Sequence, residues 1–147
     1  MANQLQLDRF LPYRLSITSN LVSDRIARAY ESMFGLSIPE WRLVAVIAEV
    51  DAITQADIGE RTRMDKVTVS RAAIALVDRG LLQRAPNATD KRSHLLSLTD
   101  AGRELYALVA PKALELERRI FASFAPGELE AFTAMLRRID AVVLETA

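Results

Sequence analysis

Small, hydrogen-bonding and cationic side chains gather in the segment 65–80, at a spacing that places them on one face of a helix. Asp65 suits the position before the first turn, because its carboxylate can accept a backbone N–H that the turn leaves unpaired. Gly80 suits the end, since it can adopt the left-handed conformation at which many helices stop. On a 3.6-residue period the inward face comprises Val69, Ala72, Ala73 and Leu76. The outward face comprises Val67, Ser70, Arg71, Ile74 and Asp78, flanked by Lys66 and Thr68.

The outward face has the chemistry of a helix that enters the major groove of DNA. A methyl or hydroxyl group can meet base edges, an Arg can bind guanine or a phosphate, and small side chains allow close approach. In helix-turn-helix proteins, the N-terminal residues of the second helix contact the bases. A surface helix with a few polar residues explains this face equally well. The flanking segments must therefore distinguish a DNA-binding helix from an ordinary surface helix.

The preceding segment predicts the first helix of a helix-turn-helix. Thr54 can cap a short helix that ends near Thr62, and Ile58 would face the second helix. Arg63 and Met64 then form the turn. Two short helices joined by a tight turn make this motif.

The following segment predicts a β-hairpin. Residues 80–85 and 94–98 have strand patterns, and a polar tip at 86–92 separates them. The tip carries Lys91 and Arg92, which can lie against a phosphate backbone or enter a minor groove. A helix-turn-helix followed by such a hairpin is a winged helix.

Two sets of residues in this region also have a characteristic order. The first set is Met64–Arg71, Leu76 and Gly80–Arg84, and the second is Asp90-Lys91-Arg92, Leu98, Thr99 and Gly102. The first resembles the recognition helix and first wing strand of the MarR family of bacterial transcription regulators. The second is similar to that family's D-x-R wing signature and to the L-T-x-x-G start of its next helix. Length and helix order also fit, so the resemblance covers nearly the whole chain.

The resemblance implies that the second helix and the wing contact DNA. The expected contacts are Lys66, Val67, Thr68, Ser70, Arg71, Lys91 and Arg92. Arg71 is the strongest expected contact, to a base or a phosphate. We expect Asp90 to orient Arg92 through a charge-assisted hydrogen bond, and the alternative is a purely structural ion pair. This wing lacks the Gly often found at a hairpin tip, which leaves its shape open.

Long helices are expected on both sides of the winged helix. One runs from about Leu7 to Phe34, with Pro12 in its first turn or at a kink. Another runs from Thr99 to about Phe124, and Pro111 predicts a kink or a break in it. The last runs from Pro126 to about Glu145, with apolar residues at alternating spacings of three and four, as in a coiled-coil seam. Spare apolar surface at both ends of the chain predicts a homodimer.

The predicted fold is mainly α-helical with a small β-hairpin wing, in one domain at 1–147. Its parts are a winged helix-turn-helix at 38–99, a recognition helix at about 65–79, a wing at about 81–98, and dimerisation helices at 5–35 and 99–146. Ser37 and Glu40 have the capping-box pattern at the start of a helix that should be buried, and Ile53 is expected to form a short strand beside the wing.

Charge is distributed unevenly along a chain of zero formal net charge. From Arg61 to Arg103 there are nine Lys or Arg residues against four Asp, so the rest of the chain has ten basic and fifteen acidic residues. A local basic patch matters more for DNA binding than the molecular total.

Several kinds of site and location are excluded or disfavoured. The chain contains no Cys, which excludes disulfides, thiolate metal sites and a cysteine redox switch in this chain. No apolar run approaches the roughly 20 residues of a membrane span. The N-terminus lacks a basic-then-apolar signal sequence, so we expect no membrane association and a cytoplasmic location.

The expected function is transcription regulation through sequence-specific binding to double-stranded DNA.

 A homodimer would present one recognition helix per protomer, so the operator should be a pseudo-palindrome with half-sites roughly 10 bp apart. We expect repression, the commoner mode in similar proteins.

The resemblance also implies a small aromatic or acidic effector that binds between the winged helix and the dimerisation helices and releases the DNA. Tyr13, Ser16, Trp41 and Arg42 could line such a crevice with aromatic surface and a cation. Tyr13 and Trp41 suit an apolar core even better.

Two other classes of protein are alternatives to a regulator. The chain has no Gly-rich phosphate loop, nucleophile motif or metal-ligand cluster, so we expect no enzyme activity, no cofactor and no metal. The remaining alternative is a winged-helix dimerisation or protein-interaction module without specific DNA binding. Arg71 and Arg92 favour DNA, because a protein-binding module has no need for both cations where DNA would lie.

Overall fold

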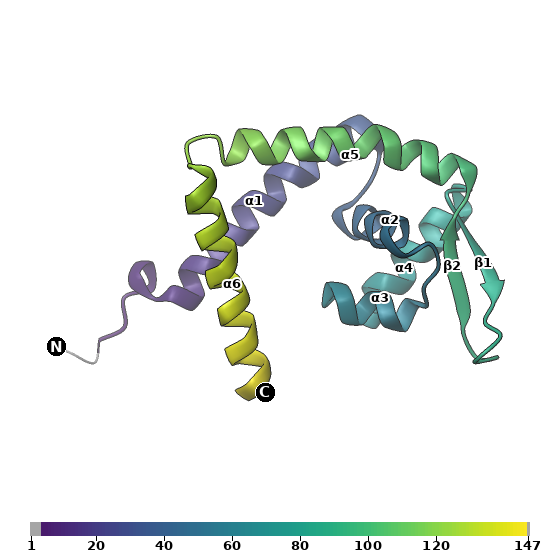
Figure 1. The fold of residues 1–147 in the computed structure, drawn as a ribbon, viewed down its shortest axis with the longest axis horizontal. Helices are drawn as coiled ribbons and strands as arrows, with labels where there is room; N and C mark the ends of the chain where they lie inside the picture. The colour runs from purple at the N-terminus through teal and green to yellow at the C-terminus, as the bar shows by residue number, and fades with distance from the viewer. Residues whose placement is uncertain (1–3, 147) are drawn as a thin grey trace. The chain divides into compact units, whose positions relative to one another are not determined.

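The structure is a computed structural model that describes residues 4–146. It is mainly helical with a two-stranded antiparallel wing, which confirms the predicted fold class (Figure 1). In chain order the elements are η1 (Leu7–Arg9), α1 (Leu11–Phe34), α2 (Ile38–Val50), α3 (Gln55–Thr62), α4 (Lys66–Asp78), β1 (Leu82–Pro86), β2 (His94–Leu98), α5 (Asp100–Ile120) and α6 (Pro126–Thr146).

The chain divides into two compact units, the first ending at Lys112 and the second beginning at Ala113. The single domain expected at 1–147 stays a prediction, and its residues 1–3 and 147 lie outside the described residues. Within the described part of the chain, no helix has both the length and the apolar character that crossing a membrane requires.

Helix α1 begins four residues later than predicted. Leu7–Arg9 form a separate 3₁₀ turn, Phe10 is extended, and the α-helix starts at Leu11. Pro12 explains the difference, because its ring would clash with the carbonyl four residues earlier if the helix continued through it. The helix ends as predicted at Gly35, which has the left-handed φ of 63°.

Helix α2 is held at its start by the predicted capping box. The Ser37 hydroxyl accepts the Glu40 N–H at 3.3 Å, and the Glu40 carboxylate accepts the Ser37 N–H at 2.7 Å. Its side chains Leu43, Val44 and Ile47 are buried, so the helix lies in the interior as expected.

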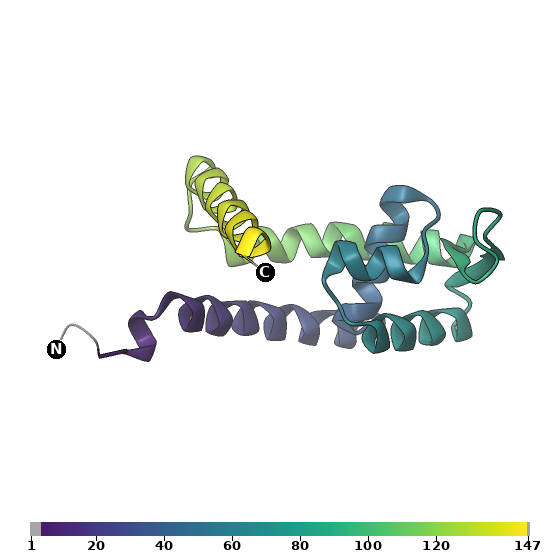
Figure 2. The ribbon, with the colours of Figure 1, turned by 90° about the horizontal axis from the view of Figure 1, so that it is seen from below.

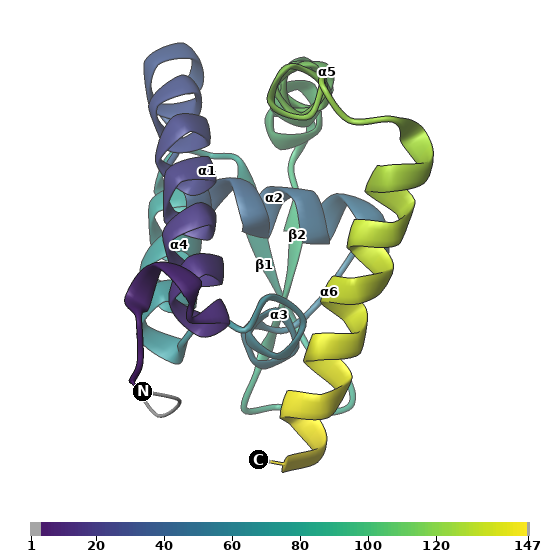
Figure 3. The same ribbon diagram turned by 90° about the vertical axis from the view of Figure 1, so that its left-hand side faces the viewer.

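The core of the first unit joins α2, α3, α4 and the wing, which Figures 2 and 3 show from two directions. Its fully buried side chains include Leu36, Leu43, Val44, Ile47, Ile58, Val69, Leu76, Leu96 and Val109. The two wing strands pair from Leu82 opposite Leu98 to Pro86 opposite His94. Ile53 forms a bridge to Leu96, which confirms the predicted short strand beside the wing.

Helix α5 passes Pro111 without interruption, so the predicted break is absent there. The helix ends at Ile120, four residues before the predicted end, and residues 121–123 form a turn. Helix α6 occupies the predicted span. Among its residues 126–145, whose side chains the structure describes, none is buried.

Candidate nucleic-acid interface

The N-terminal end of α4 is fixed by Asp65. Its Oδ1 accepts the Thr68 backbone N–H at 2.7 Å, and its Oδ2 accepts the Thr68 hydroxyl at 3.0 Å. These hydrogen bonds, with a smaller contribution from the charge of Arg71, hold the pKa of the Asp65 carboxyl below its usual value. The cap stabilises the first turn of α4, where Lys66 and Val67 lie.

The Asp65 cap predicts a pH-dependent stability. Because the folded pKa lies below the ordinary value of 3.8, the stabilisation is complete well above pH 3.8 and is lost as the pH falls through the lower folded pKa. In an Asp65→Asn variant the cap has no charge to titrate. We expect the Tm difference between wild type and this variant to shrink as the pH falls from about 6 to 2.5. A difference that stays constant across this range would contradict the charged cap.

The C-terminal end of α4 is fixed by Gly80 and Arg79. Gly80 has a φ of 74°, and the next residue, Leu81, donates its N–H to the Leu76 carbonyl at 3.0 Å. The Arg79 guanidinium donates to the carbonyls of Gly35 at 3.0 Å and Phe34 at 3.3 Å. Arg79 therefore caps the end of α1. It is one of the nine basic residues between Arg61 and Arg103, and the cap leaves its charge unavailable for DNA.

The two predicted faces of α4 are separate in the structure. On the inward face, Val69, Ala72, Ala73 and Leu76 are all buried. On the outward face Val67 is 57% exposed and Ile74 is 48% exposed, and Arg71 is exposed between them. An apolar side chain beside an Arg, both in solvent, is suited to contacting base edges in a groove.

Thr68 and Ser70 are only partly exposed. Because the Thr68 hydroxyl already donates to Asp65, Thr68 has its methyl group and its oxygen lone pairs left to offer a base. Sequence reasoning placed Thr68 on the contact surface and did not foresee that the cap takes up its hydrogen.

The wing tip is closed by side chains in place of a glycine. The Asn87 side chain accepts from the Thr89 N–H at 3.2 Å and donates to the Ser93 hydroxyl at 3.0 Å. Asp90 Oδ1 accepts the Arg92 N–H at 3.0 Å. Between residues 87 and 93 no residue has a positive φ, so these turns have no need for Gly.

A hydrogen bond joins Asp90 to Arg92, and its donor is the backbone amide. The carboxylate binds the backbone amide of Arg92, and no hydrogen bond or ion pair of the described residues joins it to the guanidinium. Asp90 thus fixes the backbone that carries Arg92, because an Asp side chain readily binds the N–H two residues on. The Lys91 and Arg92 side chains are exposed at this tip.

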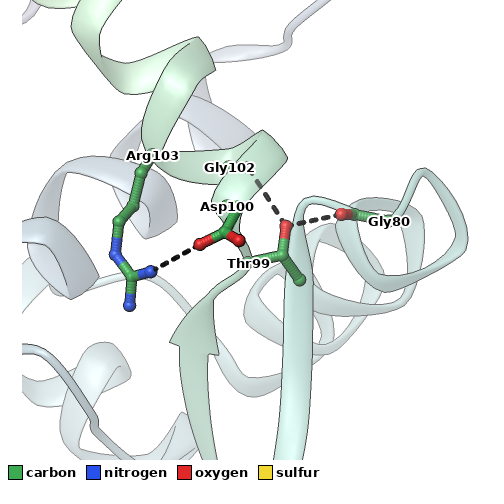
Figure 4. A network of polar contacts seen from close by, with 5 residues as sticks. All are labelled: Gly80, Thr99, Asp100, Gly102 and Arg103. Atoms are coloured by element: carbon green, nitrogen blue, oxygen red, sulfur yellow. Dashed lines mark hydrogen bonds and ion pairs between the residues drawn. The ribbon is translucent and has the colours of Figure 1, made fainter.

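Thr99 and Gly102 fasten the start of α5 to the end of α4 and the start of the wing (Figure 4). The Thr99 hydroxyl donates to the Gly80 carbonyl at 2.6 Å and accepts the Gly102 N–H at 3.1 Å. The Thr99 N–H donates to the Leu81 carbonyl at 3.1 Å. A Cβ at position 102 would overlap that same carbonyl oxygen. The L-T-x-x-G pattern therefore describes a close backbone contact.

Two of the four residues expected to line an effector crevice, Tyr13 and Trp41, lie far apart within one chain. Trp41 lies between two tyrosines, with ring centroids 5.6 Å from Tyr30 and 5.8 Å from Tyr106. Burial raises the pKa of Tyr30. Tyr13 lies 17 residues before Tyr30 on α1, which is about 25 Å along the helix axis. Within one protomer, Tyr13 therefore cannot share a small pocket with Trp41.

Ser16 and Arg42 are exposed, on α1 and α2 respectively. Sequence reasoning missed Tyr106 as a neighbour of Trp41, because the two residues are 65 positions apart and no local pattern joins them. The role of Arg79 was missed for the same reason, since its partners lie 44 and 45 residues away.

Comparison with known proteins adds to this geometry. A family model described as MarR family matches residues 34–93. YwoH, an uncharacterised HTH-type transcriptional regulator of Bacillus subtilis (strain 168), is 26% identical over 131 residues, which are 89% of this chain and 94% of the relative.

Solved structures share the fold over most of the chain. A MarR/EmrR family transcriptional regulator from Acinetobacter sp. ADP1 superposes with a TM-score of 0.88 at 24% identity, covering 96% of this chain and 99% of that one. BpsR of Bordetella bronchiseptica, whose DNA binding is regulated by 6-hydroxynicotinic acid, superposes with a TM-score of 0.74 at 22% identity. The match covers 86% of this chain and 98% of BpsR.

An exposed outward face on a helix capped at both ends, beside a wing whose tip carries cations, is the arrangement found in winged helix-turn-helix proteins. The family match at residues 34–93 covers the helix-turn-helix and most of the wing. Residues 34–93 thus match the MarR family, and the similar proteins that span most of the chain are described as transcriptional regulators.

Proposed function

We propose that this regulator is a homodimeric, cytoplasmic repressor that binds a pseudo-palindromic operator and is released by a small aromatic or acidic ligand. The observation that carries the proposal is the outward face of α4, where Val67, Arg71 and Ile74 are exposed on a helix fixed at both ends. A rigid helix pays little ordering entropy when it enters a groove.

The proposed DNA contacts are the outward residues of α4 and the tip of the wing. In α4 they are Lys66, Val67, Thr68, Ser70 and Arg71, and in the wing they are Lys91 and Arg92. Base edges would be met by Val67 and Arg71 in the major groove. The wing cations would bind phosphate or the minor groove, on the backbone that Asp90 holds.

Apolar surface supports the proposed homodimer in each unit separately. On α1, Leu11 is 79% exposed and Leu21 is 65% exposed. On α6, Phe132, Met135 and Ile139 are 42–49% exposed at spacings of three and four. A second copy would cover such side chains and place two recognition helices on one duplex, which is why the operator should be a pseudo-palindrome.

The proposed ligand is an aromatic acid or a molecule of similar chemistry. BpsR, which shares the fold, responds to an aromatic acid of this kind. Arg42 and Trp41, adjacent on α2, offer a cation and an aromatic edge. Tyr13 and Ser16 could join them only from the second protomer, because of their distance along α1. Such a ligand releases DNA only if it binds the DNA-incompetent state more tightly.

The test is binding of the purified protein to the DNA upstream of its own gene, by fluorescence anisotropy at 50 and 200 mM salt. We expect tight binding that survives excess unrelated DNA and weakens by about 10³-fold or more at the higher salt, as for proteins with several phosphate contacts. Aromatic acids added to the complex should then lower the anisotropy. Weak binding that is equal for every duplex would favour the protein-interaction module instead.

A further inference from the structure

The turn between α3 and α4 contains a residue in a conformation that its side chain does not favour. Arg63 has a φ of 59° and a ψ of 21°, in the left-handed region. Gly adopts this conformation without steric cost, and Asn tolerates it better than Arg does. Among residues 4–146, Asp51, with a φ of 70°, is the one other residue besides Gly that has a positive φ.

Within the described residues, no hydrogen bond or ion pair of the Arg63 side chain stabilises the fold. The turn is closed by Thr62, whose hydroxyl donates to the Ile58 carbonyl at 2.7 Å and accepts the Met64 N–H at 3.4 Å. The Arg63 side chain is exposed, and the hydrogen bonds and ion pairs of the described residues do not include its guanidinium. Packing and polar contacts therefore give no reason for an Arg at a position that suits Gly.

The position of Arg63 relative to α4 gives such a reason. Arg63 lies two residues before the cap Asp65, and it borders an open groove of about 640 Å³ between α3 and α4. Lys66 and Ser70, two of the proposed DNA contacts, border the same groove. The turn precedes the helix and lies off the face of Val67, Arg71 and Ile74, so a cation there meets the sugar-phosphate backbone more readily than a base edge.

We propose that Arg63 binds a DNA phosphate beside the N-terminal end of α4, and that the left-handed turn presents its guanidinium to the backbone. This inference rests on the DNA binding described above. Residues in strained backbone conformations cluster at functional sites, where the strain is part of how the site works. The contact adds affinity that does not depend on base sequence, because phosphates are the same at every position.

The experiment compares Arg63→Gly with Asp51→Gly in the full-length chain. Both changes place Gly at a positive φ, but only the first removes a cation beside α4. We expect neither variant to have a lower Tm than wild type. Arg63→Gly should bind operator and unrelated duplexes about tenfold more weakly, and the slope of log affinity against log salt should fall by about one per protomer. Asp51→Gly should keep the wild-type affinity and slope.

An Arg63→Lys variant completes the set, because it keeps the charge in the same turn. Arg63→Lys should retain the wild-type salt slope. If Arg63→Gly weakened DNA binding only by disturbing the fold, a Lys at this position would not restore that slope. Wild-type affinity and slope in Arg63→Gly would overturn the assignment of Arg63. If wild type itself bound no duplex at 50 mM salt, the DNA-binding function would fail as well, and the two failures are therefore distinguishable.

Discussion

Replacement of Arg71 by Ala is expected to weaken operator binding by about 10- to 100-fold, which corresponds to the 1–3 kcal/mol of a good Arg contact with a base. Arg71 is exposed between Val67 and Ile74 on the outward face of α4. Its side chain forms no part of the core, so the variant should fold as wild type does. Fluorescence anisotropy with operator and unrelated duplexes measures the effect.

A Lys66→Ala variant is the comparison that separates base contacts from phosphate contacts. Loss of a phosphate contact should weaken binding to every duplex by a similar factor. Loss of a base contact should weaken operator binding more than binding to unrelated DNA. Circular dichroism and sedimentation should show both variants folded and in the wild-type oligomeric state. An Arg71→Ala protein with wild-type operator affinity would contradict the proposed reading face.

Replacement of Gly102 by Ala is expected to destabilise the protein by about 1–3 kcal/mol, as overpacking of a buried site usually does. The added Cβ would overlap the Leu81 carbonyl oxygen, which belongs to the backbone and cannot move aside as a flexible side chain could. The Tm should fall by about 2–12 °C, at the 2–4 °C per kcal/mol typical of chains of this size. Thermal unfolding by circular dichroism measures the change.

Gly127→Ala is the matched control for this experiment. Gly127 lies in the first turn of α6, and a Cβ there would meet no atom within 4 Å. Its Tm should equal or slightly exceed that of wild type, because Ala favours a helix more than Gly does. A Gly102→Ala protein as stable as this control would show that the backbone contact between α5 and the wing can relax.

The helix-turn-helix and the wing could be predicted because their signals are local. Asp65 and Gly80 bound α4 as the cap preferences require, and Thr54 does the same for α3. Such signals depend on neighbours within about four residues, and these neighbours are visible in the sequence. The outward and inward faces of α4 followed from the helical period, since Val69 and Leu76 are buried while Val67 and Ile74 are exposed.

The parts that could not be predicted depend on contacts between distant residues. The partners of Arg79 and the stack of Trp41 on Tyr106 are set by how helices pack, which a single sequence does not display. The separation of Tyr13 from the Trp41 cluster, which the length of α1 imposes within one chain, was likewise not visible in the sequence. The sequence predicts that Asp90 binds Arg92 but does not distinguish the guanidinium from the backbone amide, since both are within reach of the Asp90 carboxylate.

Arg79 joins the end of α4 to the end of α1. Its guanidinium fixes the last turn of α4 to the last carbonyls of α1, while Val67 lies 12 residues, or about 18 Å, toward the other end of the helix. A tilt of about 5° around Arg79 would move Val67 by about 1.6 Å, which is several times the roughly 0.5 Å range of N–H···O distances in hydrogen bonds. A small rotation at the end of α1 would thus be amplified along α4 and would displace the proposed base contacts.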